Sequence, residues 1–409
     1  MSIMKITSIW AREILDSRGN PTIEVEVATE NSFASAAAPS GASTGKHEAV
    51  ELRDGGPRYL GKGVLRAVNN VNVHIAPAII GMDVAEQEAV DRKMKELDGT
   101  REKSRLGANA MVATSMAVLR AAAASEGKML HEYLGGSTLP HAMFNIVNGG
   151  KHAGNGLAIQ EFMIIPDDGQ FSERLRMASE VYHTLGKQLV AKLGPAARNV
   201  GDEGGYAPQL DNTYKALDAI MAAIDEVGYH DRCALALDAA ASSFFDTKSG
   251  IYRIDGKDIK EPELVDYYAD LAKSYPIKSM EDPFHEESFG AFAALKKELP
   301  EVQIVGDDLV VTNVSRLKTA IAEGSIGALL LKVNQIGTVT EAMQAVQMCR
   351  QNDLNIVVSH RSGETEDCFI ADFSVGINAS QIKTGAPARG ERTAKYNQLL
   401  RIEERMRVL

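Results

Sequence analysis

The segment ALLLKVNQIGT, residues 328–338, places a lysine directly after four apolar residues and before a turn. A lysine is almost never fully buried unless its charge is compensated. The apolar run therefore ends either at a surface or at a place where Lys332 has partners and a task. The rest of the chain favours the second alternative.

Six apolar runs in the second half of the chain each end in a residue able to do chemistry. These end residues are Asp238, Glu281, Asp307, Lys332, His360 and Lys383. After a first gap of 43 residues, the intervals are 26, 25, 28 and 23 residues, the length of one strand, one helix and two short loops. In a (β/α) barrel the carboxyl ends of the strands open on one face. Any one of these residues alone would be read as a surface charge, but all six at this period predict a common site.

The first part of the chain has a different pattern. Residues 3–15 and 21–30 read as two strands of a hairpin joined by DSRGNP, and the Gly/Ser-rich piece PSGASTGKHEA follows at 39–49. From 62 to 131 the pattern is helical, and the breaker cluster LGGSTLP follows it at 134–140. Strands followed by helices indicate an α+β arrangement.

The second part alternates strand-like and helix-like runs, as in successive βα units. A helix is expected from about Ser172 to Gly194, and another over residues 338–352, where Thr338 and Glu341 have capping-box spacing. We therefore expect an α/β protein with an N-terminal α+β domain at 1–133 and a barrel at 134–409.

The residue types narrow the chemistry of the expected site. Asp238, Glu281 and Asp307 offer only oxygen ligands, which suit a hard cation such as Mg²⁺. Without a cation, three converging carboxylates would raise one another's pKa. Lysines, a histidine and an arginine stand beside them, so we expect a substrate with several negative charges.

Two further glutamates are candidates for the same face. Glu161 lies in LAIQEFMIIP and Glu203 in the Gly-flanked turn VGDEGGYAP. If both point inward, their repulsion raises at least one pKa and keeps a proton available for general acid catalysis. Either glutamate alone would be read as a solvated carboxylate.

Composition excludes several other classes of protein. The chain has 409 residues and a net charge of −11, which argues against a nucleic-acid partner, although a local basic pocket remains compatible with an anionic substrate. Its three cysteines show no metal-type spacing and favour a reducing compartment. No signal peptide and no apolar run of 18 residues is visible, so we expect no membrane span.

Over essentially its whole length, the chain resembles the enolase family, the 2-phosphoglycerate hydro-lyases of glycolysis. Any single shared motif is weak, but their number and order are specific. They are ILDSRGNPT (14–22), SGASTG (40–45), NGGKHAGN (148–155), QEF (160–162), GDEGG (201–205), LD (237–238), MEDPF (280–284), GDDL (306–309), LLLKVNQIGT (329–338), SHRSGET (359–365) and IKTGAPARGERTAKYNQLLRIEE (382–404).

The resemblance implies an N-terminal α+β domain, carrying a glycine-rich lid loop, and a modified (β/α)8 barrel of the TIM type. It implies two Mg²⁺ ions per active site. Asp238, Glu281 and Asp307 would hold the first, and Ser43 would ligate a second that arrives with substrate.

The resemblance also implies the catalytic roles for reversible dehydration of 2-phosphoglycerate to phosphoenolpyruvate. Lys332 would remove the C2 proton, and Glu203, with Glu161 beside it, would protonate the departing C3 hydroxyl. Members of the enolase superfamily use a Lys or His base together with one or two Mg²⁺ ions. The two cations and Lys383 would lower the pKa of Lys332 toward the range of a base.

The remaining site residues would bind substrate or complete the site. Lys383 would bind the substrate carboxylate, Arg361 and Ser362 the phosphate, and His152 and His360 would complete the closed site. The resemblance further implies a cytoplasmic enzyme of glycolysis and gluconeogenesis, a homodimer or an assembly of dimers. An additional cell-surface or secreted pool without a signal peptide stays open.

The chain departs from the family pattern at two positions. Ser243 stands where SEF is usual and removes a carboxylate near Asp238, and Gly390 stands where PARSER has a serine. Three alternatives remain beside the main reading. They are a Schiff-base aldolase using Lys332, another acid dehydratase or racemase of the superfamily, and a surface receptor role beside or instead of catalysis.

Overall fold

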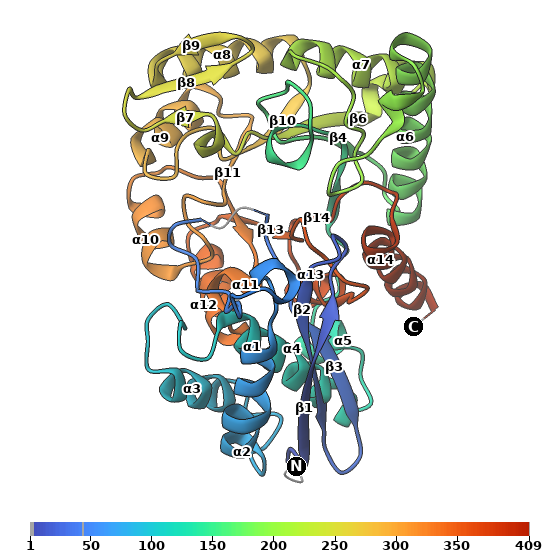
Figure 1. Cartoon of the computed structure of the whole chain (residues 1–409). Helices are drawn as coiled ribbons and strands as arrows, with labels where there is room; N and C mark the ends of the chain where they lie inside the picture. Colours follow the sequence, from blue (N-terminus) through green and yellow to red (C-terminus); the bar gives the residue numbers. More distant parts are fainter. Residues whose placement is uncertain (1–3, 43–44, 409) are drawn as a thin grey trace.

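The computed structural model describes residues 4–42 and 45–408 (Figure 1). Ser43, the expected ligand of a second Mg²⁺, lies outside the described residues. In this view the barrel elements lie above the N-terminal elements, and the strands β13 (Asn355–Ser359) and β14 (Gln381–Lys383) lie where the two parts meet. The carboxyl ends of the barrel strands therefore lie close to the N-terminal part.

The N-terminal part is built on a three-stranded antiparallel sheet. The sequence predicts its first hairpin, β1 (Ser8–Leu15) with β2 (Pro21–Ala28), and misses the third strand, β3 (Phe33–Ala37). Helix α4 (Ala108–Ser125) packs against β2 and β3. Its small residues are buried on nearly every side because α3 (Gln87–Asp98), α11 (Val333–Ile336) and α12 (Val339–Gln351) also contact it. The shorter helical elements of this part are η1 (Arg58–Gly61), α1 (Leu65–Asn69), η2 (Asn70–Ile75), α2 (Ala76–Ile79) and α5 (Leu130–Leu134).

The second part is a closed barrel, which confirms the predicted fold class. In order around the barrel its strands are β10 (Ile277–Glu281), β11 (Gln303–Gly306), β12 (Ala328–Leu331), β13 (Asn355–Ser359), β14 (Gln381–Lys383), β4 (His141–Asn148), β5 (Glu161–Pro166) and β6 (Cys233–Asp238).

The start of the barrel differs from the predicted succession of βα units. Strand β5 runs antiparallel to both β4 and β6, and two helices, α6 (Phe171–Leu193) and α7 (Thr213–Glu226), follow it before β6. A small antiparallel sheet, β7 (Phe245–Asp246), β8 (Ile251–Ile254) and β9 (Lys257–Ile259), is inserted after β6. This insertion explains why the first interval between strand ends is longer than the others.

Helices cover the outside of the barrel. The later ones are α8 (Glu261–Ser274), α9 (Phe289–Glu298), α10 (Val314–Ala322), α12, α13 (Phe369–Gly376) and α14 (Gly390–Val408). Helix α12 begins as predicted, because the Thr338 side chain accepts a hydrogen bond from the Glu341 N–H. The Glu341 carboxylate does not complete a capping box; it accepts from the Thr338 hydroxyl at 2.6 Å and pairs with Lys103 at 3.0 Å.

The alternation of side chains in β12 explains the position of Lys332. Ala328 and Leu330 belong to the apolar cluster inside the barrel, whereas Leu329 and Leu331 pack outward against the helices. Successive side chains of a strand point to opposite faces, so Lys332 continues the inward-facing set. The inner cluster consists of Met143, Met163, Ala236, Val305, Ala328, Leu330 and Val357.

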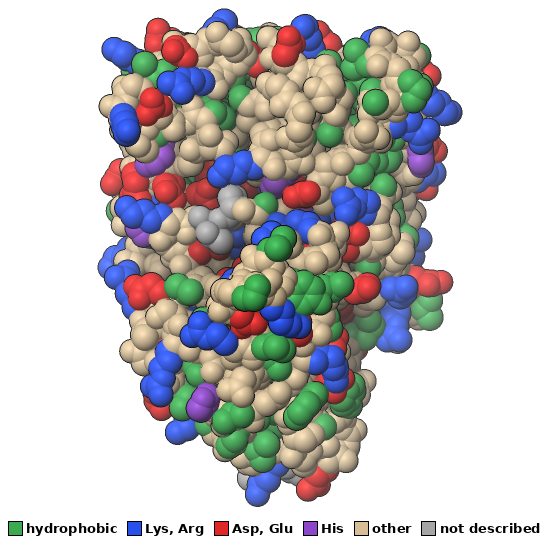
Figure 2. Space-filling model, in the orientation of Figure 1, with side chains coloured by type: hydrophobic (Ala, Val, Ile, Leu, Met, Phe, Trp, Pro, Cys, Tyr) green, Lys and Arg blue, Asp and Glu red, His purple; other side chains and the backbone are tan. Residues whose placement is uncertain are grey.

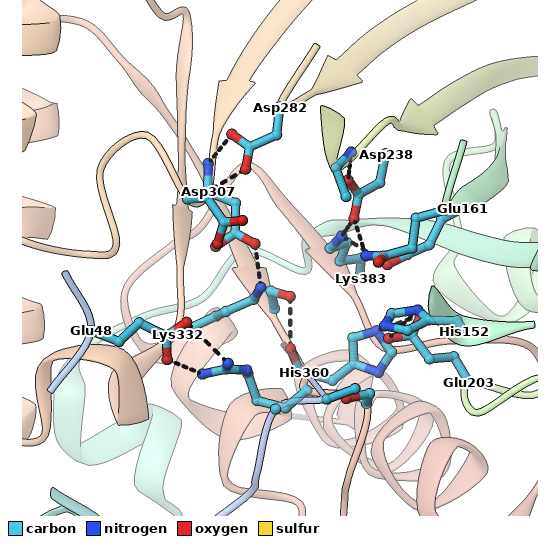
Figure 3. Close-up of a pocket in the computed structure, with 18 residues that line it drawn as sticks. Glu48, His152, Glu161, Glu203, Asp238, Asp282, Asp307, Lys332, His360 and Lys383 are labelled. Carbon is cyan, nitrogen blue, oxygen red and sulfur yellow. Dashed lines mark hydrogen bonds and ion pairs between the residues drawn. The ribbon is translucent and has the colours of Figure 1, made fainter. Parts of the chain in front are cut away.

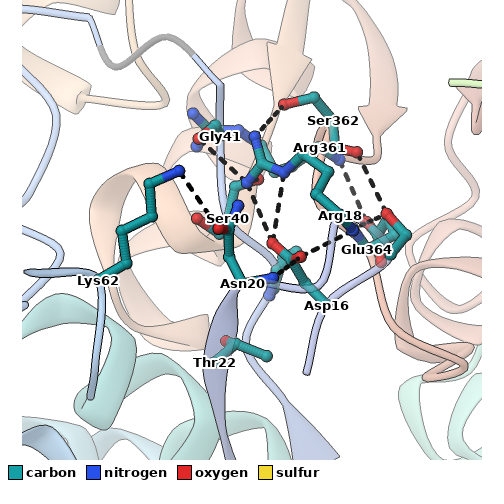
Figure 4. Close-up of polar contacts among 12 residues, drawn as sticks. Asp16, Arg18, Asn20, Thr22, Ser40, Gly41, Lys62, Arg361, Ser362 and Glu364 are labelled. Atoms are coloured by element: carbon teal, nitrogen blue, oxygen red, sulfur yellow. Dashed lines mark hydrogen bonds and ion pairs between the residues drawn. The ribbon is translucent and has the colours of Figure 1, made fainter. Parts of the chain in front are cut away.

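The DSRGNP turn joins the N-terminal part to the loop that follows β13 (Figure 4). The Ser17 N–H donates to Glu364 O at 2.7 Å, and Ser40 forms an antiparallel bridge with Gly363. Arg18 donates through Nη2 to Ser40 O at 3.1 Å and through Nη1 to Ser362 Oγ at 3.4 Å. The N-terminal part is therefore held against a loop at the carboxyl end of the barrel strands.

Within residues 4–42 and 45–408, no helix has the length and apolarity needed to cross a bilayer. All three cysteines are free.

Candidate active site

A polar pocket lies at the carboxyl ends of the barrel strands (Figure 3). In the view of Figure 2, acidic, basic and histidine side chains gather in a band between the barrel and the N-terminal part. Five of the six predicted strand-end residues line the pocket, and the sixth, Glu281, contacts Lys383 with its carboxylate. This confirms the predicted convergence. The lining of the pocket includes Glu48, His152, Gln160, Glu161, Glu203, Asp238, Asp282, Asp307, Asp308, Lys332, His360, Arg361, Ser362 and Lys383.

Lys383 lies at the centre of one group of carboxylates. Its buried Nζ is 2.7 Å from Glu281 Oε2, 3.2 Å from Asp238 Oδ2 and 3.2 Å from Glu161 Oε1. Burial lowers the pKa of Lys383, but the attraction of these carboxylates outweighs it and leaves the pKa well above its ordinary value. Lys383 is therefore a fixed positive charge in the pocket.

The carboxylates retain capacity to bind a cation. Burial, and then the charge of Asp238, raise the pKa of Glu281 well above its ordinary value. Among the residues that the structure describes, no group donates a hydrogen bond to the buried Glu281 Oε1. An orphaned, buried carboxylate oxygen in an all-oxygen donor set fits a hard divalent cation such as Mg²⁺.

A second acidic group adjoins the predicted ligands. Oxygen atoms of Asp282, Asp307 and Asp308 all lie within 4.8 Å of one another. Asp282 has a left-handed backbone, with φ of 43°, and its carboxylate accepts from the N–H groups of Asp307 at 2.9 Å and Asp308 at 2.6 Å. Asp282 therefore orients the turn that carries Asp307.

Lys332 is paired with Asp307. Their Nζ and Oδ2 atoms are 2.5 Å apart, and the Lys332 side chain is 12% exposed. Burial lowers the pKa of Lys332, and Arg361 and Lys383 lower it further, but the attraction of Asp307 dominates and the pKa is raised. The protein's own charges thus act opposite to the lowered pKa expected from the sequence, because the sequence does not reveal so close a contact with Asp307.

Glu161 and Glu203 lie together on the opposite side of the pocket. Their carboxylates and the His152 ring offer ligand atoms within 4.8 Å of one another. Burial, and then the charge of Glu203, raise the pKa of Glu161 well above its ordinary value. Burial also acts to raise the pKa of Glu203, but His152 and His360 outweigh it and hold that pKa low. The expected raised pKa is therefore found, and it belongs to Glu161.

Three side chains from different elements surround the Glu203 carboxylate, and one of them donates a hydrogen bond to it. Asn145 on β4 donates to Glu203 Oε2 at 3.0 Å. His152 Nδ1 is 3.4 Å from Oε1, and His360 Nε2 is 3.5 Å from Oε2. The carboxylate is thus fixed at the edge of the pocket with polar groups on several sides.

The turn that carries Glu203 depends on Gly201. A Cβ at this position would lie 2.4 Å from His152 O and 2.7 Å from Asn148 Cβ, which is closer than real Cβ atoms come. Gly201→Ala is expected to displace Glu203 and His152 and to lower enzymatic turnover by about 10 to 100-fold. Steady-state kinetics would measure the loss. Gly290→Ala in α9 is the matched control, because no atom of the described residues would meet a Cβ there. Equal activities of the two variants would contradict the expectation.

Arg361 is buried and lines the pocket. Its Nη1 donates to Glu48 Oε2 at 3.0 Å and its Nη2 to Glu48 Oε1 at 3.2 Å. Glu48 in turn accepts from the Gly45 N–H at 2.9 Å. Ser362 follows Arg361 in the chain, and its hydroxyl oxygen accepts a hydrogen bond from Arg18 Nη1. Two arginines and a serine hydroxyl therefore lie close together.

Sequence reasoning missed several residues that shape the site. Asp282, Asp308 and Glu48 lie inside the quoted motifs MEDPF, GDDL and KHEA, but no signal distinguishes them from surface acids. Gln160 donates to Asp238 Oδ2 at 3.3 Å, and Gln335 to Asp307 Oδ1 at 2.8 Å. The capacity of an amide to orient a carboxylate cannot be read from its position in a sequence.

The two departures from the family pattern lie away from the pocket chemistry. Ser243 is exposed, and Asp238 is oriented instead by the Ala240 N–H at 3.0 Å and by Gln160. Gly390 is the first residue of α14, and within the described part of the chain no atom would meet a Cβ placed there. A serine at position 390 would therefore fit without rearrangement.

Comparisons with known proteins agree with this geometry. The family description "Enolase, N-terminal domain" matches residues 6–134, and "Enolase, C-terminal TIM barrel domain" matches residues 136–408. Curated enolases of Methanothrix thermoacetophila and Methanosarcina barkeri are each 58% identical, over 98% of this chain and 96% and 94% of their own lengths. The enolase of Methanocaldococcus jannaschii is 57% identical over 98% of this chain and 96% of its own. The chain therefore belongs to the enolase family of hydro-lyases.

Proposed function

We propose that the protein catalyses the reversible dehydration of 2-phosphoglycerate to phosphoenolpyruvate. One observation carries this proposal. Lys332 and Glu203, a base and an acid, reach one pocket from different elements, and carboxylates, Lys383 and Arg361 lie with them. A substrate bound between Lys332 and Glu203 would present its C2 proton to one and its C3 hydroxyl to the other.

Asp238, Glu281 and Asp307 would hold one Mg²⁺, and Ser43 would ligate a second that arrives with substrate. The orphaned Glu281 Oε1 and the all-oxygen donor set support the first assignment. When bound, Mg²⁺ would stabilise the second negative charge that the substrate carboxylate acquires on loss of the C2 proton, and would screen Asp307 from Lys332.

Lys332 would remove the C2 proton in its neutral form. Its inward orientation at the end of β12 and its low exposure support this role. Lys383 is held charged by its carboxylate partners and would bind the substrate carboxylate. Lys332 would thus act as the base and Lys383 as a permanent positive charge, because their partners differ.

Glu203 would protonate the departing hydroxyl, with Glu161 as its neighbour. The raised pKa of Glu161 supplies a proton on this side of the pocket, and Glu203 stands next to it. In the reverse direction the ionised Glu203 would accept a proton from the attacking water. His152 and His360 would hold its carboxylate in place.

Arg361 and Ser362 would bind the phosphate group. The planar guanidinium suits a bidentate contact with phosphate. Glu48 now makes such a contact, so the substrate phosphate would exchange with this carboxylate as the partner of Arg361.

The broader assignments accompany this proposal. Residues 1–133 would form a capping domain over a catalytic barrel at 134–409. The enzyme would act in the cytoplasm, in glycolysis and gluconeogenesis, as a homodimer or an assembly of dimers. A small phosphorylated acid would be its substrate.

The test is turnover of 2-phosphoglycerate with and without Mg²⁺, followed by the ultraviolet absorbance of phosphoenolpyruvate. We expect formation of phosphoenolpyruvate in the presence of Mg²⁺, loss of activity on chelation and recovery when Mg²⁺ is restored. Full turnover in chelated buffer would contradict the metal assignment. Turnover of an acid sugar but not of 2-phosphoglycerate would favour another member of the superfamily.

A further inference from the structure

Helix α14 directs two fully buried cationic side chains at the loops of the active site. Arg392 and Lys395 lie three residues apart, in the segment GERTAKYN, and both have 0% exposure. Neither has a role in the proposed function. Burying two charges is costly unless each is satisfied by hydrogen bonds, so their contacts indicate what they do.

Arg392 binds both loops that surround Glu203. Its Nη1 donates to Arg361 O at 2.7 Å, and its Nη2 donates to Ser362 O at 2.6 Å and to Asp202 O at 3.0 Å. Lys395 binds the later part of the same region, through Thr365 O at 2.6 Å and Glu364 Oε2 at 3.0 Å, and its own helix through Glu391 O at 2.7 Å. Arg392 therefore joins the loop of His360 to the turn of Glu203.

One further contact of Arg392 carries chemical information. Its Nη1 lies 2.6 Å from His360 Nδ1. A guanidinium has only N–H donors and stays protonated in proteins, so the imidazole nitrogen must accept this hydrogen bond. An accepting Nδ1 carries no proton, and the single proton of a neutral imidazole then lies on Nε2.

We propose that Arg392 is a positioning residue that holds His360 in the neutral tautomer with its proton on Nε2, and so makes His360 a fixed hydrogen-bond donor toward Glu203. The functional meaning of this inference rests on the proposed function, in which Glu203 is the acid.

The surroundings of His360 Nε2 agree with this assignment. The side chain is 1% exposed, and Nε2 faces Glu203 Oε2 at 3.5 Å. Within the described ranges, no protein group lies in hydrogen-bond geometry with Nε2, so its N–H remains available to the Glu203 carboxylate or to a bound ligand. Burial and the charge of Arg392 lower the pKa of His360 to about 3, against the opposing effect of Glu203.

The tautomer determines what His360 can do for Glu203. With its proton on Nε2, His360 donates to the carboxylate that remains after Glu203 has given up its proton, but it cannot take that proton itself. The other tautomer would point a lone pair at the carboxylate and repel it. Arg392 would thus act on the reaction without touching the substrate.

The direct test is the protonation of His360 in the unaltered protein. Histidine labelled with ¹⁵N distinguishes a protonated from an unprotonated ring nitrogen by NMR, and the His360 signals are assigned by their loss in His360→Asn. We expect an unprotonated Nδ1 and a protonated Nε2. A protonated Nδ1, or an even mixture of tautomers, would overturn the proposal. This readout does not depend on turnover, so a protein with the expected tautomer that does not act on 2-phosphoglycerate would refute the proposed function alone.

Variants distinguish a residue that sets the tautomer of His360 from one that only supports the loops structurally. Arg392→Met is expected to give mixed tautomers and to lower kcat by about 100-fold with little change in KM. Lys395→Met, the matched control, removes hydrogen bonds to the same region and is expected to keep the Nε2–H tautomer of His360. Arg392→Lys restores a donor and is expected to recover most of the Nε2–H population and at least about tenfold in kcat over Arg392→Met. If Arg392→Met does not fold, Arg392→Lys and the unaltered protein decide the question. An unchanged tautomer in a folded Arg392→Met would overturn the proposal.

Discussion

Lys332→Ala is expected to lower turnover of 2-phosphoglycerate by about 10³ to 10⁴-fold and to abolish exchange of its C2 proton with solvent deuterium. Lys332 follows the inward-facing residues of β12, and its Nζ is the base proposed for this proton. NMR of substrate incubated in D₂O measures the exchange separately from dehydration. Loss of both reactions would assign Lys332 to the first chemical step.

Two controls accompany the Lys332 variant. Lys318→Ala removes an exposed lysine of the neighbouring helix α10 and is expected to leave exchange and turnover unchanged. Borohydride treatment of the unaltered enzyme with substrate should trap no adduct on Lys332. A trapped adduct would favour the aldolase alternative, because reduction by borohydride requires an imine. Retention of C2 exchange in Lys332→Ala would rule out Lys332 as the base.

The barrel could be predicted from the strand ends because two simple rules act together. Alternation along a strand directs Lys332 to the same side as Leu330, and parallel strands bring their ends to one face. These rules fail at β5. A parallel β5 would place Glu161, its first residue, at the opposite face, whereas the antiparallel strand pairs Glu161 with Asp238 beside the pocket. The chain direction of a single strand is set by its neighbours and leaves no mark in its own sequence.

The sequence predicted which types of residue form the site better than it predicted which of them contact one another. Carboxylates, lysines and a histidine at strand ends were visible, but the pairing of Arg361 with Glu48 spans 313 residues of sequence. The same limit explains the pKa of Lys332. Whether this pKa is raised or lowered depends on whether Asp307 or Lys383 lies closer to Lys332. In the structure Asp307 Oδ2 lies 2.5 Å from Lys332 Nζ, and the pKa is raised. Arg392 shows this limit most clearly, because nothing in GERTAKYN predicts a hydrogen bond to His360.

Glu203→Gln is expected to lower dehydration of 2-phosphoglycerate by about 10³-fold while C2 proton exchange continues. The amide keeps the size of the side chain and can turn its oxygen toward the Asn145 donor, so the turn should keep its shape. It cannot give a proton to the leaving hydroxyl. Because Lys332 is unaltered, the substrate can still lose and regain its C2 proton.

Asp202→Asn is the matched control for this variant, since it removes the adjacent carboxylate of the same turn and is expected to keep both reactions. The raised pKa of Glu161 makes this residue a second candidate for the proton donor, and comparing dehydration with C2 exchange in Glu203→Gln distinguishes the two candidates. If Glu161 were itself the proton donor, Glu203→Gln would dehydrate 2-phosphoglycerate at nearly the original rate. If Glu203 were needed only to hold the substrate, exchange and dehydration would fall together. Only a proton donor at position 203 predicts that dehydration is lost while exchange remains, because the two reactions share every step before the hydroxyl departs.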